Sequence, residues 1–171
     1  MNKKALVGLL IMLFAVGACG YSFRGSTSNL PPDIKTVAIP VFANNSGEIR
    51  IETMITDEVI YQFTRSKILT VVPEGQADAI LKGEVRRVIV SDVALTQQET
   101  SRQRRVAMLV AARLIRTKDK KAVWADRGMD RWRTYNVSGN PQADEAAKQA
   151  ALREVAEELA RTLHDRVLEN F

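Results

Sequence analysis

Two side chains in this sequence stand out as able to do chemistry, a single thiol and a single imidazole. Cys19 is the only cysteine of the 171 residues, so no disulfide can form within the chain. His164 lies beside the apolar stripe of a C-terminal helical pattern and next to Asp165, which is typical of a histidine on a helix surface. A zinc site needs more His or Cys, and neither a Gly-x-Ser-x-Gly turn nor a glycine-rich phosphate loop is present. The sequence therefore predicts no catalytic residue, no metal site and no cofactor, and it indicates a protein that is not an enzyme.

The residues before Cys19 have the order of a secretory signal. Lys3 and Lys4 form a basic head, residues 5–16 form an apolar run, and two small residues follow. The run is too short to span a hydrocarbon core, which needs about twenty apolar residues. We therefore predict that residues 1–18 are a signal peptide.

Residues 16–19 (VGAC) resemble the lipobox of bacterial lipoproteins. In such proteins the signal is cut just before the cysteine, which becomes the N-terminus and is acylated on its sulfur and its amine. Several acyl chains hold a protein firmly in a bilayer, because each buried CH₂ contributes about 0.8 kcal/mol. The sequence predicts lipidation of Cys19, which leaves no thiol for Cys-His catalysis. The alternative is an ordinary signal peptide that ends beside a cysteine.

Residues 19–33 and 34–171 differ in composition. The first are rich in serine, glycine and proline, as in a tether, and the second carry the periodic apolar patterns of a single α+β domain. The net charge is only +5, but eight basic residues gather within residues 102–121. Such a patch could meet an anionic lipid, an acidic partner or a nucleic acid, or it could be a solvated face. Export makes nucleic acid the poorest of these candidates.

Apolar periodicity predicts the elements that position these residues. The expected order is a strand over 34–42, a helix over 48–65, a short strand over 68–72, strands over 79–95, 102–116 and 123–135, and a helix from Pro141 nearly to Phe171. Pro40 predicts an edge position or a bulge in the first strand. Asn140 before Pro141 predicts a capped helix start. The sum is an α+β domain with two helices packed on one face of a mostly antiparallel sheet.

The strand over 102–116 has apolar residues on both of its sides. Two helices can cover only one face of such a sheet, so the other face requires a cover. The cover is either the remaining connections of the chain or another protein.

The strand over 123–135 carries two tryptophans, Trp124 and Trp132. Eight residues separate them, so we expect both on one face, unless Gly128 marks a bulge that resets the alternation. The face opposite the tryptophans is expected to carry Arg127, Arg131 and Arg133.

The first part of the predicted mature chain resembles the lipopolysaccharide-assembly lipoprotein family LptE. The resemblance lies in residues 19–25 (CGYSFRG), 30–31 (LP) and 34–42 (IKTVAIPVF), followed by an Asn-rich turn and an amphipathic helix. The later hairpin, tryptophan-bearing strand and terminal helix follow in the family's order. The resemblance implies two helices against a mixed, mostly antiparallel four-stranded sheet.

The same resemblance implies a function. It indicates an outer-membrane lipoprotein on the periplasmic side of a Gram-negative bacterium, which sits as a plug inside the large β-barrel LptD. There it would help the barrel to fold and assist the passage of lipopolysaccharide to the outer leaflet. Gly20 agrees with the outer membrane, since an aspartate after the lipidated cysteine favours retention in the inner membrane.

The resemblance also implies contact with lipopolysaccharide through basic residues near the hairpin turn and near the start of the last helix. The turn over 96–101 has no basic residue, and Lys148 is the one that follows Asn140 most closely. The candidate lipopolysaccharide-binding residues are therefore those just after the turn, Arg102, Arg104 and Arg105. We expect Arg102 and Arg104, which share a face, to contact phosphate groups of lipid A.

A lipoprotein activator of a peptidoglycan synthase, similar to LpoB, is the alternative function. Such a protein also begins with a lipobox and a strand similar to residues 37–40 (VAIP) before an Asn-rich turn. It usually has a long linker after the cysteine, whereas the tether here is short. A short reach suits a partner in the same membrane.

Overall fold

The structure is a computed structural model, and it describes residues 30–93 and 102–169. The predicted signal peptide and Cys19 lie outside these residues. In chain order the elements are β1 Thr36–Ala38, β2 Ala43–Asn44, α2 Ile51–Ser66, β3 Thr70–Val71, the 3-10 turn η1 Glu74–Gln76, β4 Ala79–Asp92, β5 Arg102–Arg116, β6 Ala122–Val137 and α3 Pro141–Glu169. The sequence predicted the bounds of β5 and the start of α3 as the structure has them. Among the described residues, no helix combines the length and the apolar character that crossing a membrane requires.

The strands form one mixed sheet of six strands, so the predicted four-stranded, mostly antiparallel sheet is wrong. Its order is β3-β1-β4-β5-β6, and β2 pairs with β4. β1 runs parallel to β3 and β4, β2 runs parallel to β4, and β4, β5 and β6 form the predicted antiparallel meander. The strand predicted over 34–42 is broken into β1 and β2, and Pro40 lies in the break. Proline has no N–H to donate to a ladder, which accounts for the break.

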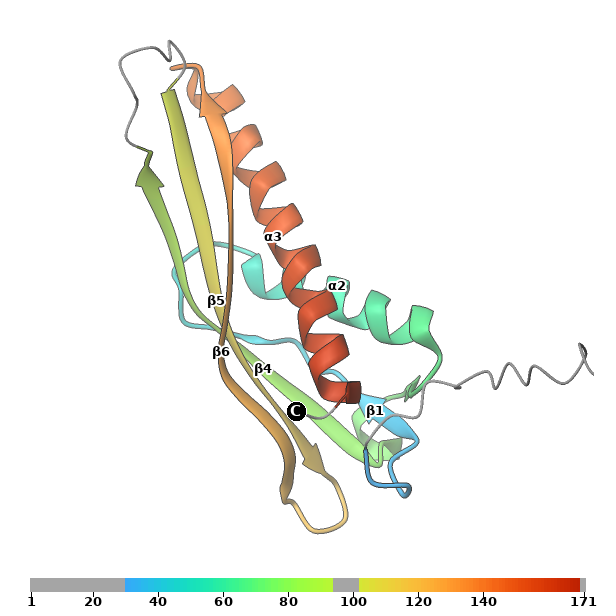
Figure 1. Cartoon of the computed structure of the whole chain (residues 1–171). Coiled ribbons are helices and arrows are strands. Elements are labelled where there is room, and N and C mark those ends of the chain that lie inside the picture. Colours follow the sequence, from blue (N-terminus) through green and yellow to red (C-terminus); the bar gives the residue numbers. More distant parts are fainter. Residues whose placement is uncertain (1–29, 94–101, 170–171) are drawn as a thin grey trace, which may run out of the picture.

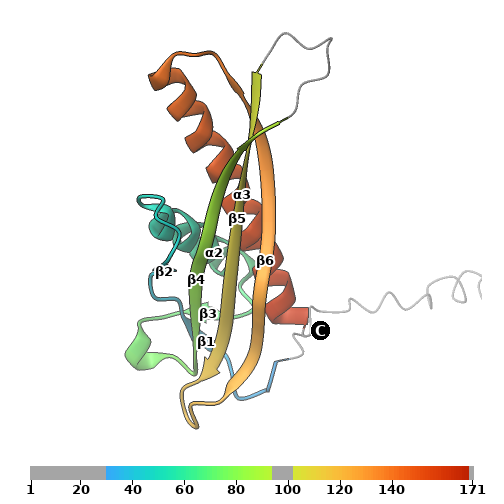
Figure 2. The same ribbon diagram turned by 90° about the vertical axis from the view of Figure 1, so that its left-hand side faces the viewer.

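Both helices lie on the same face of the sheet, as predicted (Figures 1 and 2). Helix α3 packs against β5, and alternate residues of β5 on this side are at most 1% exposed, namely Val106, Met108, Val110 and Leu114. The predicted stripe of α3 is buried against them and consists of Leu152, Val155, Leu159, Leu163 and Val167. Removing this apolar surface from water is the main source of stability of the domain.

The two helices begin differently. The Asn140 side chain accepts hydrogen bonds from the N–H groups of Gln142 and Ala143, which confirms the predicted cap of α3. Helix α2 begins at Ile51, three residues later than expected, because Arg50 has a left-handed backbone with φ of 66°.

Strand β6 contains a bulge at Gly128, which the sequence offered as the alternative to unbroken alternation. Val110 pairs with Met129 but Ala112 pairs with Asp126, so β6 has one residue more than β5 between these pairs. An extra residue reverses the faces that follow it. Trp124 is therefore buried at 8% exposure, whereas Trp132 is 47% exposed, and the expectation that the two tryptophans share a face is wrong.

The same bulge divides the arginines of β6. Arg131 and Arg133 pair with Glu158 of α3, at 2.9 and 2.6 Å, so they lie on the helix side. Arg127 is exposed beside Ala111, on the face away from the helices. The expectation that these three arginines share a face is also wrong.

Candidate functional site

The three candidate arginines lie together at the start of β5 but on two faces of the sheet. Side chains alternate along a strand, so Arg102 and Arg104 share the face that carries the helices, and Arg105 has the opposite face. The guanidinium of Arg105 lies 4.1 Å from the centre of the Trp132 ring. The structure therefore brings Arg102 and Arg104 together and separates Arg105 from them.

Arg104 already has an anionic partner. Its Nε donates a hydrogen bond to the Asp92 carboxylate at 2.8 Å, and this bond raises the pKa of the Arg104 guanidinium. Arg102 makes no hydrogen bond or ion pair with any residue of the ranges 30–93 and 102–169. Both side chains line a hollow of about 300 Å³. Arg102 is thus the cation of the pair whose charge is not offset by a described residue.

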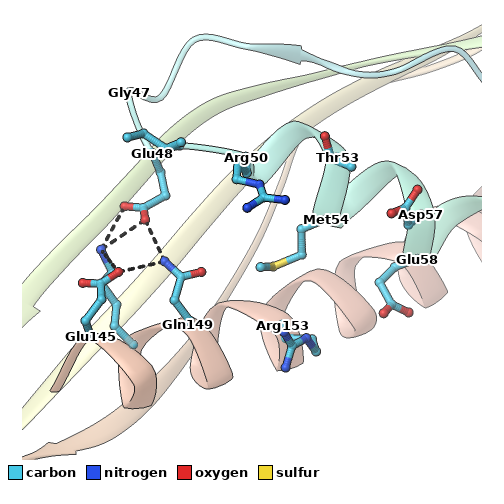
Figure 3. Close-up of a pocket in the computed structure, with 12 residues that line it drawn as sticks. Gly47, Glu48, Arg50, Thr53, Met54, Asp57, Glu58, Glu145, Gln149 and Arg153 are labelled. Atoms are coloured by element: carbon cyan, nitrogen blue, oxygen red, sulfur yellow. Dashed lines mark hydrogen bonds and ion pairs between the residues drawn. The ribbon is translucent and has the colours of Figure 1, made fainter. Parts of the chain in front are cut away.

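Lys148, the basic residue of the early turns of α3, is also paired. Its Nζ lies 3.1 Å from Glu48 and 3.2 Å from Glu145. Burial by itself lowers the pKa of Lys148, but hydrogen bonds to the two carboxylates outweigh burial and raise it above its usual value. This network ties the loop before α2 to α3, and Figure 3 shows Glu48 and Gln149 turned toward each other across it.

A pocket of about 800 Å³ opens beside this network, between the start of α2 and the side of α3 (Figure 3). Its lining includes both cations, such as Arg50 and Arg153, and anions, such as Asp57 and Glu58. Such a lining does not favour a phosphate or any other single charge. The pocket therefore has no chemistry that assigns it a ligand.

Neither helix lies over the sheet face that looks away from α2 and α3 (Figure 2). Within the described part of the chain, the segment around Ala77 covers one corner of it, at Ala38 and Ile80. Elsewhere Ile89 of β4 and Trp132 of β6 are 46% and 47% exposed, on either side of Ala107 of β5. We call the row of Ile89, Ala107 and Trp132, with the adjoining Leu109 and Arg105, the uncovered face.

The uncovered face has the composition of a protein interface. Trp, Tyr and Arg are enriched among the residues that dominate binding energy, and here the Arg105 guanidinium stacks on the Trp132 ring. The sequence left two covers open for this side of β5, the remaining connections of the chain or another protein. No described helix or long loop lies over this row, so the described connections do not cover it. The exposure of Trp132 was not predicted, because it depends on the bulge at Gly128.

His164 is more enclosed than predicted. Its side chain is 14% exposed, and its ring meets the edge of the Phe63 ring with 5.0 Å between centroids. The expectation of a surface histidine is therefore wrong, since α2 packs over it. Its Nδ1 lies 2.9 Å from the Asp165 carboxylate, and no described serine completes a nucleophile with it.

Solved structures with a similar fold come from several bacteria. A protein from Xanthomonas campestris has a TM-score of 0.59 at 18% identity, over 83% of this chain and 90% of that one. Lipoprotein B from Nitrosomonas europaea has a TM-score of 0.56 at 18% identity, over 87% and 90% of the two chains. A minor lipoprotein from Acinetobacter baumannii has a TM-score of 0.53 at 13% identity, over 82% and 95%. These similarities establish a fold that occurs in bacterial lipoproteins.

The family is shown by the sequence itself. No curated protein matches the chain. The model of the lipopolysaccharide-assembly family LptE matches residues 34–167, which is most of the 171-residue chain. The chain belongs to the LptE family, which is the family that the segments within residues 19–42 resemble.

Proposed function

We propose that this protein is an outer-membrane lipoprotein that plugs an LptD-type β-barrel, helps it to assemble, and assists the transport of lipopolysaccharide to the outer leaflet. Residues 1–18 are removed as a signal peptide, and the acylated Cys19 holds residues 34–171 at the periplasmic side through the tether of residues 19–33. Membership of the LptE family is the observation that carries this proposal.

The uncovered face supports a partner of the barrel type. A plug must expose apolar and aromatic side chains to a second protein, and it buries them only after docking. Trp132 and Ile89 are exposed in the chain alone, whereas Val106, Met108, Val110 and Leu114 of β5 are buried on the helix side of the sheet. We assign the uncovered face to the wall of the barrel.

Co-purification after mild detergent extraction tests this proposal. We expect the wild-type protein to retain a large β-barrel, and Trp132→Asp to lower the retained barrel by about tenfold or more, because it buries a charge at the centre of the contact. Tyr61→Asp is the matched control, since Tyr61 is a 55% exposed aromatic on α2 that also has an arginine, Arg65, over its ring. Equal loss in both variants, or no loss in either, would contradict the assignment of the face.

The same experiment separates the two functions that the sequence left open. A synthase activator would retain a penicillin-binding protein in place of a barrel. The LptE family match favours the barrel.

We further propose that lipopolysaccharide contacts the protein through Arg102, with Arg104 as its neighbour on the same face. The structure adds that Arg104 is held by Asp92, so Arg102 is expected to contribute more. Arg102→Glu should lower retention of lipopolysaccharide in a pull-down more than Arg105→Glu does, because Arg105 lies on the opposite face. If an Arg102→Glu, Arg104→Glu double variant retained as much lipopolysaccharide as the wild type, these two arginines would not form the contact.

A further inference from the structure

Two like charges lie directly opposite each other at one end of the sheet. Lys82 of β4 pairs in register with Arg113 of β5, on the face away from the helices, and both side chains are exposed. Neither makes an ion pair or a hydrogen bond through its side chain with a described residue. Like charges in this position repel each other and destabilise a sheet. An anionic group bound between them would relieve the repulsion.

The two cations stand at the rim of a hollow of about 540 Å³. The floor of the hollow consists of small side chains from β5 and β6, namely Ala111, Ala122 and Ala125. Two acids, Glu84 and Asp126, also line it, but each has a cation of its own, because Glu84 lies 3.9 Å from Arg86 and Asp126 pairs with Arg166. Arg127 is on the rim too, and Arg86 reaches across β5 to donate a hydrogen bond to the Arg127 carbonyl at 2.8 Å. A floor without long side chains lets a head group approach the strand backbone between the cations.

The turn between β5 and β6 adds three exposed lysines, Lys118, Lys120 and Lys121. Asp119, the acid among them, lies 3.6 Å from Arg116 and so has a cation of its own. We call the six residues Lys82, Arg113, Lys118, Lys120, Lys121 and Arg127 the lower basic patch. None of their side chains is paired with an acid of the residues described.

The lower basic patch lies at the end of the domain where the chain enters it. Arg116, at the end of β5, is 3.5 Å from Asp33, and Figures 1 and 2 both show the first described residues beside the turn between β5 and β6. Leu30 is eleven positions after Cys19. A glycine- and serine-rich segment of that length spans roughly 20 Å as a coil and about 40 Å when fully extended.

We propose that the lower basic patch docks on the anionic phospholipid head groups of the leaflet that holds the acyl chains of Cys19. The short tether brings this end of the domain to that leaflet, and six cations without acidic partners are the chemistry that recognises its phosphates. Docking of the patch fixes the orientation of the domain, with the uncovered face further along the same face of the sheet, toward the end opposite the tether. The proposal rests on the acylation of Cys19 but not on a barrel partner.

Lysine acetylation in vesicles tests this proposal. The acylated mature protein is reconstituted without any partner, in vesicles of phosphatidylcholine alone or with about a third of phosphatidylglycerol. An acetylating reagent is added, and the acetylation of each lysine is followed by mass spectrometry. We expect acetylation of Lys82, Lys118, Lys120 and Lys121 to slow by roughly threefold or more in the anionic vesicles, and to recover in about 0.5 M salt. Lys67, an exposed lysine at the end of α2, is the control residue, and its acetylation rate should be the same in both kinds of vesicle.

A matched pair of variants sharpens the result. The double variant Lys82→Glu, Arg113→Glu keeps a like-charged pair across the strands but reverses its sign. The protection of Lys118, Lys120 and Lys121 from acetylation by anionic vesicles should therefore be lost. Arg87→Glu with Arg105→Glu makes the same change of charge further along the same face and should leave that protection in place. Protection that vanishes equally in both pairs would overturn the proposal.

The remaining outcomes separate this proposal from the proposed function. A protein that floats with both kinds of vesicle but shows equal acetylation rates overturns the docking alone. A protein that floats with neither overturns the acyl anchor and the docking with it. If the lysines are protected from acetylation only after a barrel protein is added, the patch binds that protein and the lipid docking is overturned.

Discussion

Gly83 of β4 shows how closely single residues are fitted in this fold. A Cβ atom at this position would come 2.2 to 2.3 Å from carbons of the Phe42 ring, which is itself buried. The ring would have to move within a filled core, so we expect Gly83→Ala to lower the free energy of unfolding by about 1–3 kcal/mol. Urea denaturation measures this, with Gly75→Ala as the control because nothing lies within 4 Å of its added Cβ. Equal stability of the two variants would show that the ring moves freely.

Two aspartates make the stability of the domain depend on pH. The Asp78 carboxylate accepts hydrogen bonds from the N–H groups of Lys35 and Thr36, each at 3.0 Å, and these bonds hold its pKa below the usual 3.8. The pKa of Asp144 is lowered in the same way, chiefly by the N–H of Ser138. A lowered pKa in the folded state means that the unfolded chain takes up protons first as the pH falls.

We expect Asp78 and Asp144 to stabilise the fold fully above pH 3.8. This stabilisation should be lost as the pH falls through their pKa values in the folded state, which are lower than 3.8. Urea midpoints measured between about pH 2 and pH 6 should therefore fall at the acid end, and Asp78→Asn should reduce the size of that fall. An Asp78→Asn variant with the wild-type acid dependence would mean that the carboxylate does not hold β1 to β4.

At the level of single residues, the sequence predicted those whose partners are close in the chain. Asn140 caps α3 through N–H groups two and three residues further on, so its role follows from local spacing. His164 was wrongly placed at the surface, because its neighbour Phe63 comes from the other helix. Contacts across elements are not encoded in local periodicity.

At the level of elements, the long strands were predicted within three residues of their bounds, but the faces of an interrupted strand were not predicted. β5 alternates without a break and has the predicted bounds, Arg102–Arg116. β4 and β6 both contain register shifts, at Val85/Arg87 and opposite Val110/Ala112. One bulge is enough to move Trp132 from the core to the surface, so the place of Trp132 on the uncovered face was not foreseen.

The pairing of Lys82 with Arg113 leads to a prediction about stability. Lys82→Glu places opposite charges across the two strands, so it should stabilise the isolated protein by about 0.2–1 kcal/mol at low salt. Thermal or urea unfolding measures the change, and Lys82→Gln serves as the control that removes charge without adding a pair. A Lys82→Glu variant that is less stable than Lys82→Gln would mean that the two side chains do not face each other.

At the level of the whole molecule, the parallel part of the sheet could not be predicted from the sequence. β1, β2 and β3 have two or three residues each, too few for a pattern that identifies their neighbours. The strand order and the count of six strands follow from contacts between these short pieces and β4. The two-layer arrangement was predictable, because each helix has one apolar stripe.

The whole molecule also divides its surfaces by task. One sheet face is covered by α2 and α3, the other carries Trp132 and Ile89, and the end beside Leu30 carries the lower basic patch (Figures 1 and 2). This division suits a protein that is tied to a membrane at one end and fits a neighbour along one face. No residue of the described part needs to transform a substrate for that role.

Site-specific photo-cross-linking in living cells tests the central claim most directly. A benzoylphenylalanine at position 132 should form an adduct with a large outer-membrane β-barrel, and the same residue at position 61, on the helix side, should form far less of it. An adduct at position 61 with none at position 132, or an adduct with a penicillin-binding protein at either, would contradict the claim that the uncovered face meets the barrel.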